Sequence, residues 1–352
     1  MRLTLRLAGV VTLSLAAALC AAFQLVGVPS ASAVWSPGAL FALPVDIAVS
    51  GSHAWVVNNY MSLKSPLANS ITELKVSNGS LVRVISLSHV VGGLNAPSSI
   101  AASGTHVWVT DLNRIIELNA SNGSVVRVIE AKTQLHVMDP TPLFAITASG
   151  TKVWVANLNS VIEINASNGS VVRVVKAKAD RFSMPFGIVV SGSHVWVMND
   201  VIGDRITELS ASNGSLVRVI NPKAGVFNQP AFAASGSHVW IANYDGNSVT
   251  ELNASNGSLV RVIGLRAIVG FNGPFTIAAS GAHLWVTNVS TVVELNASNG
   301  SLVRVLNAKA DGFDTSSAVY AFDSIHVWVV NVQSNSVTEL NASNGSLVRL
   351  IK

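Results

Sequence analysis

Histidine, glutamate and arginine recur along this chain at nearly constant spacing, and these side chains are the ones that acid–base and metal chemistry uses. The recurring residues are His53, His106, His194, His238, His283 and His326; Glu73, Glu117, Glu163, Glu208, Glu251, Glu294 and Glu339; and Arg83, Arg127, Arg173, Arg218, Arg261, Arg304 and Arg349. Lys152 replaces histidine once without disturbing the pattern. Such regular positions do not make one metal site. We therefore interpret the histidines as half-buried strand residues, and the Glu–Arg series as exposed ion pairs across neighbouring strands.

Polar and charged residues that occur in one repeat only are better candidates for a site, because the repeat does not require them. The ligand-binding candidates are Asp46, Tyr60, Asp111, Arg114, Asp139, Arg181, Asp200, Tyr244 and Asp245. Asp46 stands where we align Ser99, Ala145, Gly187, Phe232, Thr276 and Val319 in the other repeats. No cofactor is predicted; if a divalent metal binds, Asp46 and Asp111 are its expected ligands.

Two sequence segments alternate seven times and define the repeat. The first, of the type Gly-Ser-His-Val-Trp-Val-x-Asn, places tryptophan at Trp55, Trp108, Trp154, Trp196, Trp240, Trp285 and Trp328. The second, of the type Glu-Leu-Asn-Ala-Ser-Asn-Gly-Ser-Leu-Val-Arg-Val-Ile, carries an Asn-Gly dipeptide each time. Runs rich in Val, Ile, Trp and Thr on both sides of Asn-Gly or Ser-Gly predict short strands joined by hairpin turns.

Each repeat therefore contains four short strands, and its length of about 40–50 residues is typical of one propeller blade. We predict an all-β, seven-bladed β-propeller with four antiparallel strands per blade. The predicted blades are 42–86, 95–129, 141–175, 185–220, 230–263, 274–306 and 316–352. Because every repeat is complete, we expect blade seven to close on blade one without exchanging a strand. The variable loops should share one face of the ring, where binding residues usually lie.

The N-terminus has the features of an export signal. Arg2 and Arg6 precede the apolar stretch 7–28, which is followed by Ala31-Ser32-Ala33. We expect a signal peptide at 1–33, a propeller at 34–352, and secretion without membrane insertion after cleavage; an uncleaved anchor is the alternative. The 22 basic residues, two of them in the signal, nearly balance the 18 acidic ones, which argues against a nucleic-acid partner. We expect a monomer.

The repeat resembles known propeller families. Trp285-Val286-Thr287-Asn288 is similar to the element that names the YVTN repeats, and Phe182/Pro185 and Phe227/Pro230 are similar to the lead-in of NHL-type propellers. The resemblance implies a bacterial exported propeller. Members of such families include scaffolds, binding proteins, lactonases and lyases, so the resemblance specifies the architecture rather than the activity.

Binding is the function that these observations favour over catalysis. The chain has no Ser-His-Asp arrangement, phosphate-binding glycine loop or Cys/His metal spacing. We expect a non-catalytic binding or scaffolding module for an extracellular protein, peptide or glycan. A metal-dependent lactonase or lyase with its site at the channel mouth is the alternative.

Overall fold

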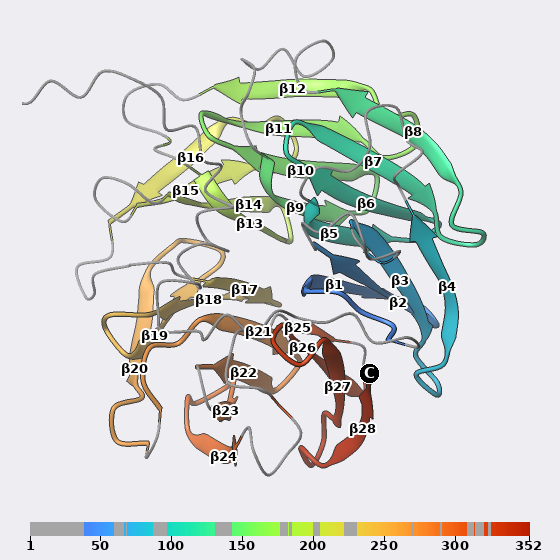
Figure 1. Cartoon of the computed structure of the whole chain (residues 1–352). Coiled ribbons are helices and arrows are strands. Elements are labelled where there is room, and N and C mark those ends of the chain that lie inside the picture. Colours follow the sequence, from blue (N-terminus) through green and yellow to red (C-terminus); the bar gives the residue numbers. More distant parts are fainter. Residues whose placement is uncertain are drawn as a thin grey trace, which may run out of the picture.

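The computed structural model of the chain shows how the seven repeats are arranged (Figure 1). It describes residues 39–59, 67, 69–86, 97–130, 143–176, 182, 185–199, 205–221, 231–268, 271–288, 291–307, 313, 320–322 and 325–352.

The strands fall into four ranks from the centre of the ring to its rim. The innermost strands are β1 (Pro44–Ser50), β5 (Pro97–Ser103), β9 (Leu143–Ser149), β13 (Pro185–Ser191), β17 (Ala231–Ser235), β21 (Thr276–Ser280) and β25 (Tyr320–Phe322). The second rank is β2 (His53–Asn58), β6 (His106–Asp111), β10 (Lys152–Asn157), β14 (His194–Asn199), β18 (His238–Asn243), β22 (His283–Thr287) and β26 (His326–Asn331). The third rank is β3 (Ser70–Lys75), β7 (Arg114–Asn119), β11 (Ser160–Asn165), β15 (Ile206–Ser210), β19 (Ser248–Asn253), β23 (Thr291–Asn296) and β27 (Ser336–Asn341). The outermost strands are β4 (Leu81–Ser86), β8 (Val125–Glu130), β12 (Val171–Lys176), β16 (Leu216–Ile220), β20 (Leu259–Gly264), β24 (Leu302–Asn307) and β28 (Leu347–Ile351).

Each run of four consecutive strands forms one antiparallel sheet, and the seven sheets stand around a common centre (Figure 1). The prediction of an all-β, seven-bladed propeller is therefore confirmed. Within the part of the chain that the structure describes, no helix is long and apolar enough to cross a membrane.

Two kinds of turn close the hairpins of each blade on one face of the ring, which we call the repeat face. In blade two they are the Ser-Gly turn at Gly104 (φ +59°) and the Asn-Gly turn at Gly123 (φ +71°). Both backbone angles lie in the left-handed region that glycine tolerates best. The Asn122 side chain fixes the second turn, because its Oδ1 accepts a hydrogen bond from the Ser124 N–H (2.9 Å). The described ends of the second strands and starts of the third strands, together with the described starts of the innermost strands, lie on the opposite face, which we call the variable face.

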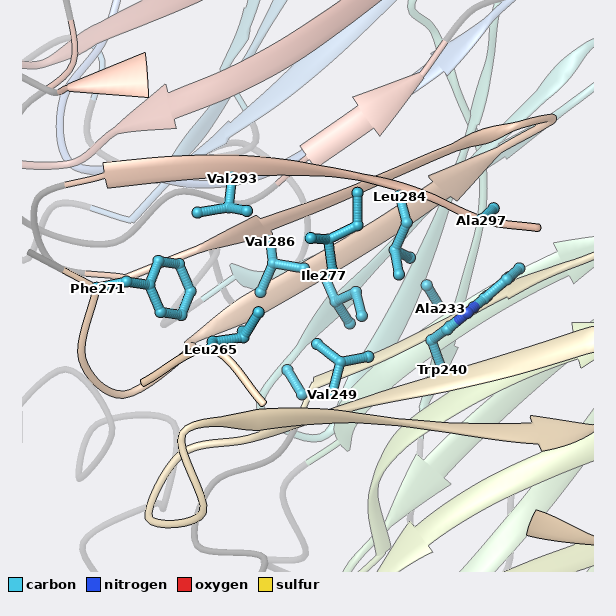
Figure 2. Packing of buried hydrophobic residues seen from close by; sticks show 12 residues of the cluster. Ala233, Trp240, Val249, Leu265, Phe271, Ile277, Leu284, Val286, Val293 and Ala297 are labelled. Carbon is cyan, nitrogen blue, oxygen red and sulfur yellow. The ribbon is translucent and has the colours of Figure 1, made fainter. Parts of the chain in front are cut away.

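The hydrophobic core lies between blades rather than inside one. Trp240 of blade five packs against Ile277, Leu284 and Val286 of blade six in the cluster that Figure 2 shows. All seven repeat tryptophans are buried, and clusters of this kind join every pair of neighbouring blades. Both faces of each sheet are apolar because each sheet is covered on both sides.

Blade seven closes the ring on blade one through the same kind of contact. Trp328 joins a cluster with Phe41 and Ile47 of blade one. The backbone N–H of Leu43 donates to Oδ1 of Asn335 (2.7 Å) across this junction. All four strands of blade seven come from the C-terminal part of the chain, so the predicted closure without strand exchange is confirmed.

Candidate functional site

The repeated charged residues form one compact group in each blade. In blade two, Trp108, Glu117 and Arg127 lie directly opposite one another on three adjacent strands. Arg127 Nε lies 2.5 Å from Glu117 Oε2, and His106 Nδ1 lies 2.5 Å from Glu117 Oε1. All seven glutamates are fully buried. The expectation of exposed Glu–Arg pairs was therefore wrong, because the strand register brings each glutamate beneath its arginine and beside the tryptophan.

Blade three shows that histidine is replaceable in this group. Lys152 places its Nζ 2.8 Å from Glu163 Oε1, on the opposite carboxylate oxygen from Arg173. The same ammonium group also donates to the backbone oxygen of Ala211 in blade four. A lysine thus contacts the carboxylate oxygen that histidine contacts in the other blades, which indicates a structural rather than a catalytic role.

The arginine of each group also links its blade to the next. Arg261 Nη2 donates to the backbone oxygen of Ser298 in the Asn-Gly turn of blade six (2.8 Å). The corresponding bond from Arg349 reaches Ser77 O of blade one (3.3 Å), so this series of bonds continues across the ring closure. Burial raises the pKa of Glu73 and of Glu208, and the neighbouring arginine and histidine oppose that rise. The repeated charges are therefore part of the scaffold.

Asp46 of blade one contacts the backbone of blade two. Its Oδ2 accepts a hydrogen bond from the Ile100 N–H (2.9 Å), and its Oδ1 accepts one from the Ile47 N–H (2.8 Å). Burial raises the pKa of Asp46 to about 6, although these two bonds and one from the Ser99 side chain favour the ionised form. Asp46 thus joins two innermost strands where each begins.

Strand pairing corrects the residue that we aligned with Asp46 in blade five. Asp46 pairs with Val57, which is two residues after Trp55. The equivalent residue in blade five is Ala242, two residues after Trp240, and it pairs with Ala231 rather than with Phe232. Asp46 and Ala231 each lie five residues before the glycine of the following Ser-Gly turn, so Ala231 is the counterpart and the expected alignment with Phe232 was one residue off.

Asp111 and Arg114 are brought together at the end of the β6–β7 hairpin. Both are buried, and Arg114 Nε lies 3.9 Å from Asp111 Oδ2 and 3.8 Å from Glu130 Oε1. In blade one the corresponding side chains, Asn58 and Ser70, form a neutral hydrogen bond (3.1 Å). An ion pair therefore occupies the place of an amide–hydroxyl pair.

Tyr244 and Asp245 lie in the turn between β18 and β19, on the variable face. The Tyr244 ring is 4.9 Å from the Phe275 ring of blade six and covers Gly273, where an added Cβ would come within 2.6 Å of it. Asn247 anchors the same turn, because its Nδ2 donates to Phe271 O (3.1 Å). Asp245 is exposed.

The remaining candidates, Tyr60, Asp139, Arg181 and Asp200, lie outside the described residues. Among the described residues, no group of three or more His, Cys, Asp or Glu side chains could hold a metal ion.

Sequence reasoning missed partly exposed aromatic residues at the start of the innermost strands. Phe144, Phe186 and Phe275 occupy the position next to the counterpart of Asp46 in blades three, four and six, where blade two has Ser98. Only some of the blades carry phenylalanine at this position, so the repeat does not require it, and a search restricted to polar and charged residues of a single repeat could not find it.

The geometry defines a seven-bladed propeller with a uniform repeat face and a variable face, and solved structures share this fold. The chain is similar to hydrazine synthase of Kuenenia stuttgartiensis (TM-score 0.65, 14% identity, 90% of this chain and 100% of that one). It is also similar to the β-propeller domain of Cps50 (Swd1) from Myceliophteria thermophila (TM-score 0.65, 11% identity, 85% and 97%). The computationally designed Ika8 protein is similar as well (TM-score 0.63, 12% identity, 89% and 88%). At these identities the likeness establishes the fold alone. No protein-family model and no curated protein sequence matches the chain.

Proposed function

We propose that this protein is an exported, non-catalytic binding or scaffolding propeller that recognises an extracellular protein, peptide or glycan through its variable face. One observation carries the proposal. In each blade the repeated glutamate lies beside its arginine and beside a histidine or, in blade three, a lysine, whereas Tyr244, Asp245 and Phe275, which the repeat does not require, lie on the variable face. A rigid scaffold that presents individual loop residues is the usual form of a binding propeller.

The contacts of these loops support the proposal, because they hold the variable face in one shape. The turn at Asn247 is fixed to the lead-in of blade six, and the turn at Asn335 is fixed to the lead-in of blade one. Backbone N–H of Leu143 in blade three likewise donates to Leu112 O of blade two (2.7 Å). Preorganised loops lose less conformational entropy on binding than mobile ones.

Surface plasmon resonance against a panel of glycans and cell-envelope preparations from the producing cell would test this proposal. The comparison uses the purified protein, the variable-face variant Tyr244→Ala/Asp245→Ala and the repeat-face control Lys75→Ala. We expect at least tenfold weaker binding of the ligand by the double variant and unchanged binding by the control. Equal affinities of the three proteins, or loss only in the control, would contradict the assignment of the variable face.

Melting in EDTA and in millimolar calcium, magnesium or manganese separates this proposal from a metal-dependent lactonase or lyase. A metal at about 100 times its dissociation constant adds roughly 2.7 kcal/mol to the free energy of unfolding. We expect no such rise, because Asp46 accepts backbone hydrogen bonds and Asp111 faces Arg114. A rise with one ion that Asp46→Ala abolishes would instead favour the enzyme.

A further inference from the structure

The Asn-Gly turns of the repeat face contain a dipeptide that can modify itself. Because glycine has no side chain to hinder the approach, its backbone nitrogen can attack the Cγ atom of the preceding asparagine. A bond forms between these two atoms, ammonia leaves with the amide proton, and one water molecule opens the resulting ring to aspartate or isoaspartate. All seven turns have the sequence Ser-Asn-Gly-Ser, at 77–80, 121–124, 167–170, 212–215, 255–258, 298–301 and 343–346. Their intrinsic reactivity is therefore equal, and a difference between them must come from the fold.

Two hydrogen bonds oppose this reaction in every folded turn. In blade one the attacking group, the Gly79 N–H, donates to Lys75 O (2.8 Å), and Asn78 Oδ1 accepts a bond from the Ser80 N–H (3.0 Å). The other six turns have the same two bonds. Both bonds must break before the reaction, so its rate depends on how easily the turn opens.

A further side chain holds the start of the turn in most blades. In blade two, Asn119 Oδ1 accepts hydrogen bonds from the Ser121 N–H (2.8 Å) and from the Ser121 hydroxyl (2.7 Å), and we call this pair of bonds the turn cap. The same cap comes from Asn165, Asn253, Asn296 and Asn341. In blade four, Ser210 takes this position, and its Oγ accepts a longer bond from the Ser212 N–H (3.3 Å).

Blade one lacks the turn cap. Lys75 occupies the position, and its exposed side chain has no oxygen atom that could accept a hydrogen bond. The next residue, Val76, is buried in the cluster that closes the ring, so the base of the turn is held. The missing cap therefore weakens the part of the turn that contains the exposed Asn78.

The arginine that contacts this turn also differs in origin. Arg349 Nη2 donates to Ser77 O (3.3 Å) across the ring closure, between two blades that are not consecutive in the chain. In the other turns the arginine comes from the preceding blade, as Arg83 does for Ser121 O (3.2 Å). The turn of blade one thus has the fewest side-chain hydrogen bonds of its own and depends on the non-covalent closing contact.

We propose that Asn78 is a deamidation site of the folded protein, and that the folded turns protect the other six repeat asparagines. The modification replaces a neutral amide by a carboxylate. In the isoaspartate form it also lengthens the turn backbone by one atom, which disrupts the bonds that join Lys75 to Gly79 and Ser80. Deamidation should therefore loosen the turn between β3 and β4 irreversibly.

Incubation of the full chain at mildly alkaline pH, below its melting temperature, tests the proposal. Fragment masses of its peptides assign deamidation to each asparagine and separate the repeats from Asn272, which precedes Gly273 outside the repeat. In guanidinium chloride the seven repeat sites should react at one rate. In the folded protein we expect Asn78 to react about threefold to tenfold faster than Asn122, with Asn213 between them, which is the effect of one or two ordinary hydrogen bonds on an opening equilibrium.

Exchange of the cap between two blades tests its cause. Lys75→Asn installs the cap in blade one, and Asn119→Lys removes it from blade two. We expect the first variant to slow Asn78 to the rate of Asn122, and the second to speed Asn122 to the rate of Asn78, with the other five sites unchanged. Far-UV circular dichroism and the melting temperature show that both variants are folded.

Four outcomes would overturn the proposal. They are equal rates in the seven folded turns, a faster reaction in another repeat turn, no reaction at Asn78 while the unfolded reference reacts, and rates that neither variant changes. The last outcome would mean that a contact other than the cap controls the opening of the turn.

Discussion

At the scale of single residues, the role of a charged side chain depends on whether the other blades have the same residue at that position. Glu117 is repeated and buried between His106 and Arg127, whereas Asp46 is unique and joins the backbones of two blades. Both carboxylates have structural partners. A carboxylate in a sequence can look available for chemistry when its hydrogen bonds come from strands that are distant in sequence.

Asp46 should make the stability of the protein depend on pH. Its pKa is about 6 in the folded state against 3.8 as the ordinary value, so folding takes up a proton between about pH 4 and pH 6. The contribution to the free energy of unfolding is therefore present below pH 4 and is lost as pH rises through 6, by at most about 3 kcal/mol. Urea unfolding of the wild type and of Asp46→Asn at pH 4 and pH 7 measures it.

The difference in stability between these two proteins isolates Asp46, because the other titrating groups are common to both. We expect the wild type to lose stability relative to Asp46→Asn between pH 4 and pH 7. A difference that is constant with pH, or that changes in the opposite direction, would show that burial does not control this carboxyl.

The His–Glu–Arg group predicts a large loss of stability for one substitution and a small loss for another. Arg127→Ala leaves Glu117 buried with only His106 beside it, and breaking a buried pair in this way costs on the order of 3 kcal/mol. Lys152→His should cost less than about 1 kcal/mol, since six other blades use histidine there. Chemical denaturation of both variants provides the comparison. Similar losses from both would mean that the group is not a common scaffold element.

At the scale of the element, the two turns on the repeat face differ in what surrounds their glycines. At Gly123 an added Cβ would lie 2.9 Å from Arg83 Cδ and 2.9 Å from Ile85 Cδ1 of blade one. At Gly104 it would meet no atom within 4 Å. The Asn-Gly turn at Gly123 is therefore packed against the neighbouring blade, whereas the space beside Gly104 in the Ser-Gly turn is open.

Alanine at these two positions should separate backbone strain from packing. Gly104→Ala should cost about 1–2 kcal/mol, the price of a left-handed backbone angle. Gly123→Ala adds the displacement of Arg83 and Ile85, for about 1–3 kcal/mol more. Thermal unfolding of the two variants gives the difference directly, and equal losses would argue against tight packing of blade two on blade one.

The elements were predictable from the sequence because strand propensity, turn residues and repeat length all indicated the same blade. The position of Glu117 beneath Arg127 was not, because it depends on the exact register of three strands. The exposure of Leu259 was also not predictable, since a Val-rich outer strand has the same composition as a buried one. For the candidate site, comparison of the repeats selected Asp111 and Arg114 because the other blades lack them, but it could not show that the two side chains form an ion pair.

At the scale of the whole molecule, the ring is held by seven inter-blade contacts of one kind, and the contact between blades seven and one joins the two ends of the chain. Phe41 is buried in that closing contact, and Phe271 is buried in the contact between blades five and six. The two phenylalanines have the same role, each in the segment that leads into an innermost strand. They therefore allow the closing contact to be compared with an internal one.

If the ring is one cooperative unit, Phe41→Ala and Phe271→Ala should each lower the free energy of unfolding by about 3–5 kcal/mol, in a single transition. If the closing contact were weak, Phe41→Ala would instead loosen blade one alone, as in a linear repeat protein whose ends unfold first. Native-state hydrogen exchange distinguishes the two cases. In the cooperative ring, amides of β2 and β18 lose protection equally in both variants; in an open ring, Phe41→Ala would affect β2 and leave β18 unchanged.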